Sequence, residues 1–568
     1  MGKWFNSRVS RSTRPRPGLA ILAALTSCAA PSGNPSLERW AAAKSREIRR
    51  IDPRTAPPDA RFNVPRLLEP ATRSVHPLNE EERRRAEATR ELYARAIGRD
   101  SLRSLLWTGI ESANPLTRDG GYRWNSLREQ GMYDAAKRQK LVAKLNEIGI
   151  VNLRVGLTNH EIDADDDRTW AEHDAILGDL AAGGLRLSLD LHHFGIEDRF
   201  RAVDADGKTV PERSWYLHPE WPDYFARFAG RAFDRYGDRI RAVTLINEPE
   251  PTVGFNSEFW HGAFPGWSSP QHNFYYIERA IQVGKAAVKA RMSIEERQAK
   301  RETRADVFYL HTEATVYKPY WEDFNRFVRF FVSDLMLGHE WLMEADLEEL
   351  ERMPMDRIVG RWRGKRDDER TAFDWIIENY VVYRQPPEKR DERRARLVAL
   401  LRELRGLHRE LKARYGKTMR DDLVFAVDYY THNEDKDREG VKLDPRPENY
   451  PDQVRSGRRA GLYAVIVDYY NHFRVPVMIG ESGTPWHAYG AMWAQQMLLE
   501  CAKAEGQGVP VLGCTIYPAI DTYGWETALS LPKEKTILNP SGIVDLDLEP
   551  RPFIHRLIDD LKVRIPER

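Results

Sequence analysis

The stretch RAVTLINEPEP, residues 241–251, decides how this chain should fold, because it joins an apolar run to a carboxylic acid at Glu248. A second stretch of the same design, VPVMIGESG at residues 475–483, carries Glu481 just past its own apolar run. Short, near-continuous apolar runs are typical of strands buried on both faces, as in parallel sheets. The two stretches therefore predict two buried strands, each with a glutamate at its carboxyl end.

Six further apolar runs repeat this design along the chain, with amphipathic segments such as 134–149 and 221–237 between them. Eight strand-and-helix units predict an α/β fold of the (β/α)₈ TIM-barrel type, whose active sites lie at the carboxyl ends of the strands. A doubly wound sheet shares the alternation, but the count of eight and the position of both glutamates favour the barrel. The eight predicted strands are 104–110, 149–157, 185–191, 240–246, 306–311, 422–430, 475–481 and 509–517.

The gap between the fifth and sixth strands is long and predicts a helical insertion over residues 318–421. Within it, residues 390–416 have apolar positions at helical spacing inside a charged face, which predicts an exposed helix. We divide the chain into a signal-like segment (1–28), a linker with an N-terminal helix starting near Asn79 (29–100), and the barrel domain (101–568).

The N-terminus combines features of an export signal. Residues 1–17 carry five basic side chains and no acid, and the apolar run GLAILAALTS follows at residues 18–27. The sequence LTSC resembles a bacterial lipoprotein signal, in which Cys28 would be lipidated, so we expect an exported or membrane-anchored lipoprotein. The alternative is a disordered basic tail on a cytoplasmic protein. Nothing later in the chain approaches the ~20 apolar residues that span a membrane.

The composition gives little support to several classes of partner. Lys and Arg number 87 against 86 for Asp and Glu, so net charge gives no reason to expect nucleic acid or an anionic membrane as a partner. Three cysteines make a disulfide framework unfavoured. The 16 Trp and 23 Tyr offer flat faces that suit sugar rings, although most such residues belong to the core.

Two glutamates at a barrel mouth fit the chemistry of glycosidic bonds. In a retaining mechanism one carboxyl protonates the leaving oxygen and the other attacks the anomeric carbon, about 5–5.5 Å away. Arg154 ends the second strand and is placed either to set positive charge beside Glu481 or to join a salt-bridge layer of the barrel. Tyr430 follows the sixth strand and could hold Glu481 by a hydrogen bond, in which case Tyr429 faces the other way.

Other polar and aromatic residues at the strand ends are candidate substrate contacts. Asn247 precedes Glu248 and suits the sugar 2-hydroxyl. Two histidines, His192 and His193, follow the third strand; because neighbours on a strand face opposite sides, we predict a hydroxyl contact from His193 and no shared metal site. Past the eighth strand come Tyr517 and Trp525, and the tryptophan either forms a sugar-binding wall or packs between barrel and helix. After the fifth strand stands Glu313, which we rank as a substrate contact or a supporting group.

The order of the motifs resembles glycoside hydrolase family 1, a family of retaining (β/α)₈ glycosidases with catalytic glutamates on strands four and seven. The resemblance runs from about residue 104 to 565. It implies a hydrolase of β-glycosides that needs no metal or organic cofactor and acts on a carbohydrate. The motifs are LLWTGIESA (105–113), NLRVG (152–156), LHHFG (191–195), INEPEP (246–251), VDYYT (427–431), GESG (480–483), YPAIDTYGW (517–525) and GIVDLDLEPRP (542–552).

The resemblance also implies a role for each residue and exposes several departures. Glu248 becomes the acid/base and Glu481 the nucleophile, with nucleophile partners and glycone contacts at Arg154, Tyr430, His193, Asn247 and Trp525. The family's sugar-binding glutamate before the last tryptophan is here Gly524, with Glu526 on the other side. Further departures are Tyr517 for a tryptophan, Asp428 and Ser482 for asparagines, and Glu111 or Asn114 near an expected glutamine.

These departures leave three interpretations open. The catalytic pair favours a retaining β-glycosidase of the β-glucosidase or β-galactosidase type. The same chemistry also serves a transglycosidase or a polysaccharide hydrolase of the same clan. The altered glycone contacts also leave open a third interpretation, a non-catalytic sugar-binding or scaffold protein built on a glycosidase barrel.

Overall fold

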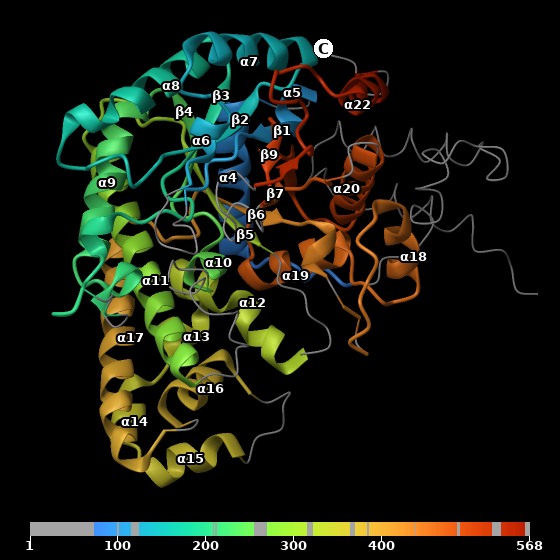
Figure 1. The fold of residues 1–568 in the computed structure, drawn as a ribbon. Helices are drawn as coiled ribbons and strands as arrows, with labels where there is room; N and C mark the ends of the chain where they lie inside the picture. Colours follow the sequence, from blue (N-terminus) through green and yellow to red (C-terminus); the bar gives the residue numbers. More distant parts are fainter. Residues whose placement is uncertain are drawn as a thin grey trace, which may run out of the picture.

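Eight parallel strands close into a barrel in chain order, each bonded to the next and β8 to β1 (Figure 1). The predicted (β/α)₈ fold is confirmed, since each of the eight apolar runs supplies one strand. The computed structural model describes residues 73–98, 102–114, 124–207, 210, 213–254, 270–314, 322–363, 370–382, 385–434, 436–437, 439–485, 489–524 and 536–562. The strands are β1 (Leu106–Gly109), β2 (Asn152–Gly156), β3 (Arg186–Asp190), β4 (Ile240–Thr244), β5 (Phe308–Ala314), β6 (Leu423–Asp428), β7 (Val477–Glu481) and β8 (Val511–Ile516).

Helices surround this barrel on its outer side (Figure 1). After β8, two short strands, β9 (Thr522–Tyr523) and β10 (Leu538–Asn539), pair with each other. The longer helices outside the insertion are α7 (Ala135–Ile148), α8 (Ala171–Ala182), α9 (Trp221–Tyr236), α11 (Pro270–Ala299), α19 (Leu462–Phe473), α20 (Gly490–Glu505) and α22 (Pro552–Lys562). Shorter ones are α5 (Leu102–Leu105), α6 (Ser126–Glu129), α10 (Pro249–Gly254) and α18 (Tyr450–Arg455).

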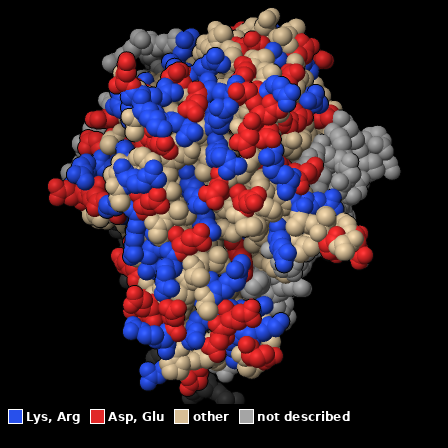
Figure 2. Space-filling model, turned by 90° about the vertical axis from the view of Figure 1, so that its left-hand side faces the viewer, with Lys and Arg blue, Asp and Glu red and all other residues tan. Residues whose placement is uncertain are grey.

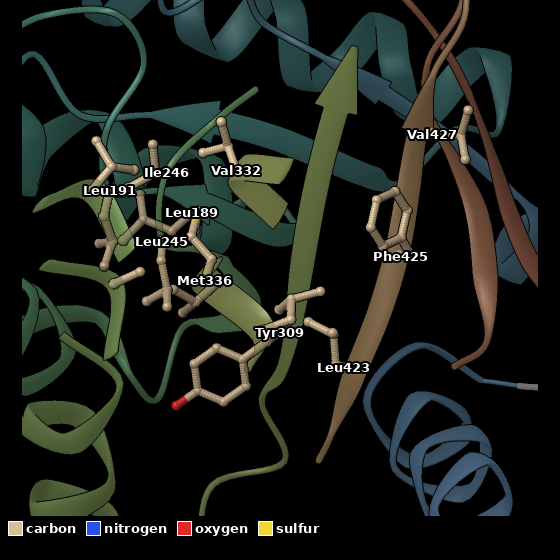
Figure 3. Packing of buried hydrophobic residues seen from close by; sticks show 14 of the residues in the cluster. Leu189, Leu191, Leu245, Ile246, Tyr309, Val332, Met336, Leu423, Phe425 and Val427 are labelled. Atoms are coloured by element: carbon tan, nitrogen blue, oxygen red, sulfur yellow. The ribbon is translucent and has the colours of Figure 1, made fainter. Parts of the chain in front are cut away.

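Side chains alternate between two apolar layers along each strand, as the pleat requires. On β5, Tyr309 belongs to the layer outside the barrel while Leu310 belongs to the barrel interior. Figure 3 shows part of the outer layer, where Leu245 beyond β4 lies beside Met336 of a covering helix. Burial on both faces explains why the strands read as continuous apolar runs.

The amino-terminal end of the barrel is closed by α4 (Glu80–Ile97), which confirms the helix predicted there. Asn79 caps it in a capping box with Glu82, the start signal that the sequence carries. The helix inserts Tyr93 among the interior side chains, where its ring centroid lies 5.1 Å from that of Phe308. The boundary predicted at residue 100 therefore falls between the barrel and a helix that completes its core.

The predicted insertion forms a layer of helices at the lower part of Figure 1. Its longest member, α17, packs along α11 and buries Leu397, Leu401 and Leu404, so only its outer face is exposed. Basic and acidic side chains are interspersed over the face seen in Figure 2, in keeping with the balanced composition. The insertion helices are α12 (Glu322–Leu337), α13 (Glu340–Glu344), α14 (Leu347–Arg352), α15 (Met355–Arg363), α16 (Ala372–Ile377) and α17 (Pro387–Tyr415).

Two further expectations concern thiols and membrane spans. Cys501 in α20 and Cys514 in β8 are buried free thiols. Within the described residues, every helix is either too short or too polar to cross a bilayer.

Replacing Tyr93 with phenylalanine should lower the free energy of unfolding by about 2 kcal/mol, because two buried groups then lack their partner. The Tyr93 hydroxyl accepts a hydrogen bond from Trp107 Nε1 and donates one to the Ser104 carbonyl, each 2.9 Å long. Denaturant titration measures the change, with the partly exposed Tyr415→Phe as the matched control. A Tyr93→Phe variant as stable as that control would contradict the role assigned to this helix.

Candidate active site

Two glutamates and an aspartate meet at the carboxyl end of the barrel. Glu481 is the last residue of β7, Asp428 ends β6, and Glu248 stands four residues past the end of β4. One carboxylate oxygen from each lies within 4.8 Å of the others. Asp428 is fully buried and Glu481 nearly so, whereas Glu248 is partly exposed. The structure thus brings together the two glutamates singled out by the sequence and adds a third carboxyl to them.

Arg154 on β2 is the cation that neighbours these acids. Its Nη1 donates to Glu481 Oε1 at 2.6 Å, and its Nε lies 2.8 Å from Asp190 Oδ2 on β3. Its Nη2 donates to Asn247 Oδ1. Burial opposes the charge, but the surrounding carboxylates, Asp190 first, raise the pKa of Arg154 well above its usual value. One guanidinium therefore links the ends of β2, β3, β4 and β7.

Tyr430 lies on the other side of the Glu481 carboxylate. Its hydroxyl donates to Glu481 Oε2 at 2.9 Å. The neighbouring Tyr429 faces away, donating to Glu434 Oε1 at 2.5 Å and stacking on Trp493. The alternation expected for adjacent residues is present, and both oxygens of Glu481 are held by donors.

Asn247 and His193 extend the hydrogen-bond network that begins at Arg154. Asn247 Oδ1 accepts a hydrogen bond from Thr312 at 2.8 Å, and its Nδ2 lies 3.1 Å from His193 Nε2. The same His193 nitrogen lies 3.5 Å from Glu111 Oε1. His192 points elsewhere, with its Nε2 2.9 Å from the Tyr216 hydroxyl in an aromatic cluster. The two histidines occupy different surroundings, as the alternation predicts.

The carboxyls differ in their electrostatic surroundings. Burial, followed by the negative charge of Glu481, raises the pKa of Glu248 well above its usual value. Burial also raises the pKa of Glu481, but Arg154 and His193 oppose the shift. Burial and then the charges of Glu481 and Glu248 raise the pKa of Asp428 strongly. Glu481 therefore loses its proton more readily than Glu248, and a difference of this kind is what separates a nucleophile from an acid.

The backbone at Glu248 adopts a left-handed conformation with φ of 42°, which is uncommon outside glycine. Its N–H donates to the Thr312 carbonyl at 3.1 Å, and α10 begins at the following proline. Sparsely populated conformations of this kind cluster at functional sites, where surrounding contacts enforce them. The turn between β4 and α10 therefore sets the direction of the Glu248 side chain.

Of the remaining predicted site residues, two are buried in the structure and two lie outside the described part of the chain. Tyr517 is buried beside β1, with its ring packed against Gly109. Glu313 is fully buried and accepts hydrogen bonds from Glu250 N and Ser333, both at 3.2 Å. A fully buried carboxyl offers no surface to a substrate, so of the two roles expected for Glu313 the supporting one fits. Trp525 and Cys28 lie outside the described residues.

Three further acids belong to this network, and the sequence-based site did not include two of them, Asp190 and Asp428. Asp190 pairs with Arg154, and Asp428 joins Glu248 and Glu481; the sequence signal for both aspartates is an acid on the last position of a buried strand. Glu111 follows β1 and approaches His193. The sequence pointed to Glu111, together with Asn114, because both lie near the place in this loop where the family has a glutamine.

A second cluster of potential metal ligands lies among the helices, at Asp334, His339 and His472. Asp334 accepts from Trp341 Nε1 and pairs with His472 Nε2, both at 2.6 Å. The two imidazoles stack with an interplanar angle of 9°, so their in-plane lone pairs run parallel and do not converge on one point. The cluster is better described as a hydrogen-bonded and stacked contact between α12, α13 and α19.

Solved structures with the same fold include β-glycosidases. The β-glycosidase of the hyperthermophile Thermosphaera aggregans aligns over 81% of this chain and 96% of its own, with 14% identity and a TM-score of 0.50. The family 1 β-glucosidase of Thermotoga maritima aligns over 82% and 98%, with 12% identity and a TM-score of 0.48. No protein-family model and no curated protein sequence matches the chain. The match to the T. aggregans structure confirms the barrel fold that the resemblance implies.

Replacing Arg154 with methionine should lower the free energy of unfolding by roughly 3–5 kcal/mol near neutral pH, because buried carboxylates lose their counter-ion. Removing the guanidinium raises the folded-state pKa of Asp190 from below its usual value and raises that of Glu481 further above its own. Their contribution to stability is therefore lost as pH increases, and the deficit should shrink toward acid pH. Denaturant titrations at several pH values measure this.

The matched control is Arg95→Met, which removes an exposed pair with Asp306 and should cost under about 1 kcal/mol at every pH. An Arg154→Met deficit as small and as independent of pH as the control's would show that Arg154 does not neutralise the buried acids.

Proposed function

We propose that this protein is a retaining β-glycosidase, with Glu248 as acid/base and Glu481 as nucleophile. The observation that carries the proposal is the close approach of the two carboxyls, whose nearest oxygens lie within 4.8 Å. Inverting enzymes hold their carboxyls about 6.5–9.5 Å apart to admit a water molecule, whereas retaining enzymes need about 5–5.5 Å. The fold shared with the β-glycosidase of T. aggregans is consistent with this chemistry.

The reaction proceeds in two displacements. A Glu481 oxygen forms a bond to the anomeric carbon while the glycosidic bond breaks, and Glu248 delivers its proton to the departing oxygen. Glu248, now ionised, then takes a proton from water, whose oxygen attacks the same carbon and releases Glu481 as a carboxylate. Each displacement inverts the anomeric centre, so the product retains the β configuration. A sugar hydroxyl in place of water would give transglycosylation from the same intermediate.

The neighbours of Glu481 suit the first displacement. Arg154 and Tyr430 each hold one of its oxygens, at 2.6 and 2.9 Å, which fixes the carboxylate and favours its ionised form. Asn247 and His193 lie beside the pair and provide amide and imidazole groups for glycone hydroxyls. We assign Tyr517, and Trp525 beyond the described residues, to the same sugar-binding wall.

A non-catalytic sugar-binding protein is the second candidate, favoured by one observation. Gly524 stands where the family has a glutamate that binds the glycone, and its N–H instead pairs with the Ile537 carbonyl. The export signal that ends at Cys28 lies outside the described residues and remains our proposal for both candidates. A mechanism-based label at Glu481 separates an enzyme from a binding protein.

Glu481→Gln should reduce turnover of an activated aryl β-glycoside by roughly 10³-fold or more, because the nucleophile is lost. Azide should restore turnover in Glu481→Ala and give an α-glycosyl azide, since it attacks from the vacated side. In the unmodified protein, a 2-deoxy-2-fluoroglycoside should add one glycosyl unit at Glu481, read by intact mass and peptide mapping. Near-native activity in Glu481→Ala, or reversible binding of a sugar panel with no adduct, would reject the assignment.

Tyr430→Phe should move the acid limb of the kcat/KM profile to higher pH. The hydrogen bond from Tyr430 favours ionised Glu481, so its loss raises the pKa of that carboxyl. Because the nucleophile acts only when ionised, activity at low pH falls more than activity at the optimum. The adjacent Tyr429→Phe is the matched control, since its hydroxyl faces Glu434, and its acid limb should stay in place. Identical limbs in both variants would contradict the role of Tyr430.

A further inference from the structure

The candidate site carries more negative than positive groups. Arg154 is the guanidinium that the described strand ends contribute, and His193 is the imidazole beside it. Arg154 is already engaged by two of the acids. Glu248 and Asp428, whose pKa values are raised well above the usual range, are protonated and add no charge. The negative charge in excess of Arg154 comes from Asp190, Glu481 and Glu111, and its potential attracts cations. The five carboxyls of the site belong to Glu111, Asp190, Glu248, Asp428 and Glu481, and all of them except Glu248 are buried.

Glu111 is the acid of this set that neither Arg154 nor the catalytic pair requires. Its Oε1 accepts a hydrogen bond from Ala113 N at 2.8 Å and lies 3.5 Å from His193 Nε2. Within the described part of the chain, no hydrogen bond reaches its Oε2. The side chain is only 9% exposed, so the loop after β1 holds the carboxylate in place. A carboxylate accepts hydrogen bonds and donates none, so its best partner is a donor.

The Tyr517 hydroxyl supplies an independent sign of a ligand at the same place. The side chain is 6% exposed, and among the described residues its oxygen has no hydrogen-bond partner. Tyr517 follows β8 and Glu111 follows β1, two strands that pair with Thr108 beside Ile516, and the Tyr517 ring packs against Gly109, two residues before Glu111. After burial, the charge of Glu111 is the largest cause that raises the pKa of Tyr517. Buried hydroxyls normally have a partner, so this one is ready to bond to a bound molecule.

Resting on the glycosidase function proposed above, we infer that the substrate's glycone carries an ammonium group, bound by Glu111 with Tyr517 beside it. The ammonium offers three donors and a positive charge to a site rich in acceptors and negative charge. The network runs from Asn247 through His193 to Glu111, with steps of 3.1 and 3.5 Å. With Asn247 assigned to the sugar 2-hydroxyl, Glu111, two contacts further along this network, is assigned to position 2 or to its neighbour 3. The substrates of choice are therefore 2-amino- or 3-amino-deoxy-β-glycosides.

The test compares 4-nitrophenyl β-D-glucoside with its 2-amino-2-deoxy and 3-amino-3-deoxy analogues at a pH at which the amines are protonated. At least one amino glycoside should show a kcat/KM about tenfold or more above that of the glucoside, as expected for a charge-assisted hydrogen bond. Glu111→Gln keeps the shape and removes the charge. It should abolish that preference, mainly by raising KM for the amino glycoside.

Glu87→Gln on the exposed face of α4 is the matched control and should leave the preference unchanged. Turnover of the glucoside in preference to both amino analogues, or a preference that survives in Glu111→Gln, would overturn the inference while leaving the glycosidase function intact.

Binding measurements separate the inference from the proposed reaction. Calorimetry with methyl β-D-glucoside and the two methyl amino-β-glycosides needs no turnover. Tighter binding of an amino glycoside, lost in Glu111→Gln, would support the cation site even if no aryl glycoside were hydrolysed, in which case only the glycosidase function fails. Equal affinity for neutral and cationic sugars would reject the cation site.

Discussion

The carboxyl end of this barrel depends on one buried guanidinium. Arg154 reaches from β2 to Asp190 on β3, to Asn247 beyond β4 and to Glu481 on β7, so it links elements that are far apart in sequence. Buried carboxylates without a counter-ion are strongly destabilising, and arginine is suited to several planar contacts at once. The same contacts that make the strand ends compatible with burial also fix the position of the Glu481 carboxylate. The stability of the strand ends and the placement of the Glu481 carboxylate therefore depend on the same interaction.

Much of the fold was predictable because the strands are buried on both faces. Such strands read as apolar runs, and eight of them separated by amphipathic segments leave few alternatives to a closed barrel. The start of α4 was predictable for a local reason, since Asn79 and Glu82 form a capping box. That α4 inserts Tyr93 into the barrel was not predictable, because this contact depends on long-range packing that no local pattern encodes.

The site was predictable to a similar degree and for similar reasons. Glu248 and Glu481 were found because each follows an apolar run, and alternation along a strand separated Tyr430 from Tyr429 and His193 from His192. Asp428 was missed as a member of the carboxyl cluster, although it ends a strand, because its partners come from β4 and β7. Glu313 was expected near the rim as a candidate contact, yet the chain buries it completely. Depth within a barrel depends on neighbouring helices, here α10 and α12, and sequence position alone does not give it.

The left-handed backbone at Glu248 has a consequence for the evolution of this chain. A non-glycine residue in this conformation costs about 1–2 kcal/mol, and desolvation of the partly exposed carboxyl adds a further cost. Glycine would remove both costs and would delete the acid. Selection for thermal stability alone would therefore favour loss of this side chain, so stability and activity make opposite demands on position 248.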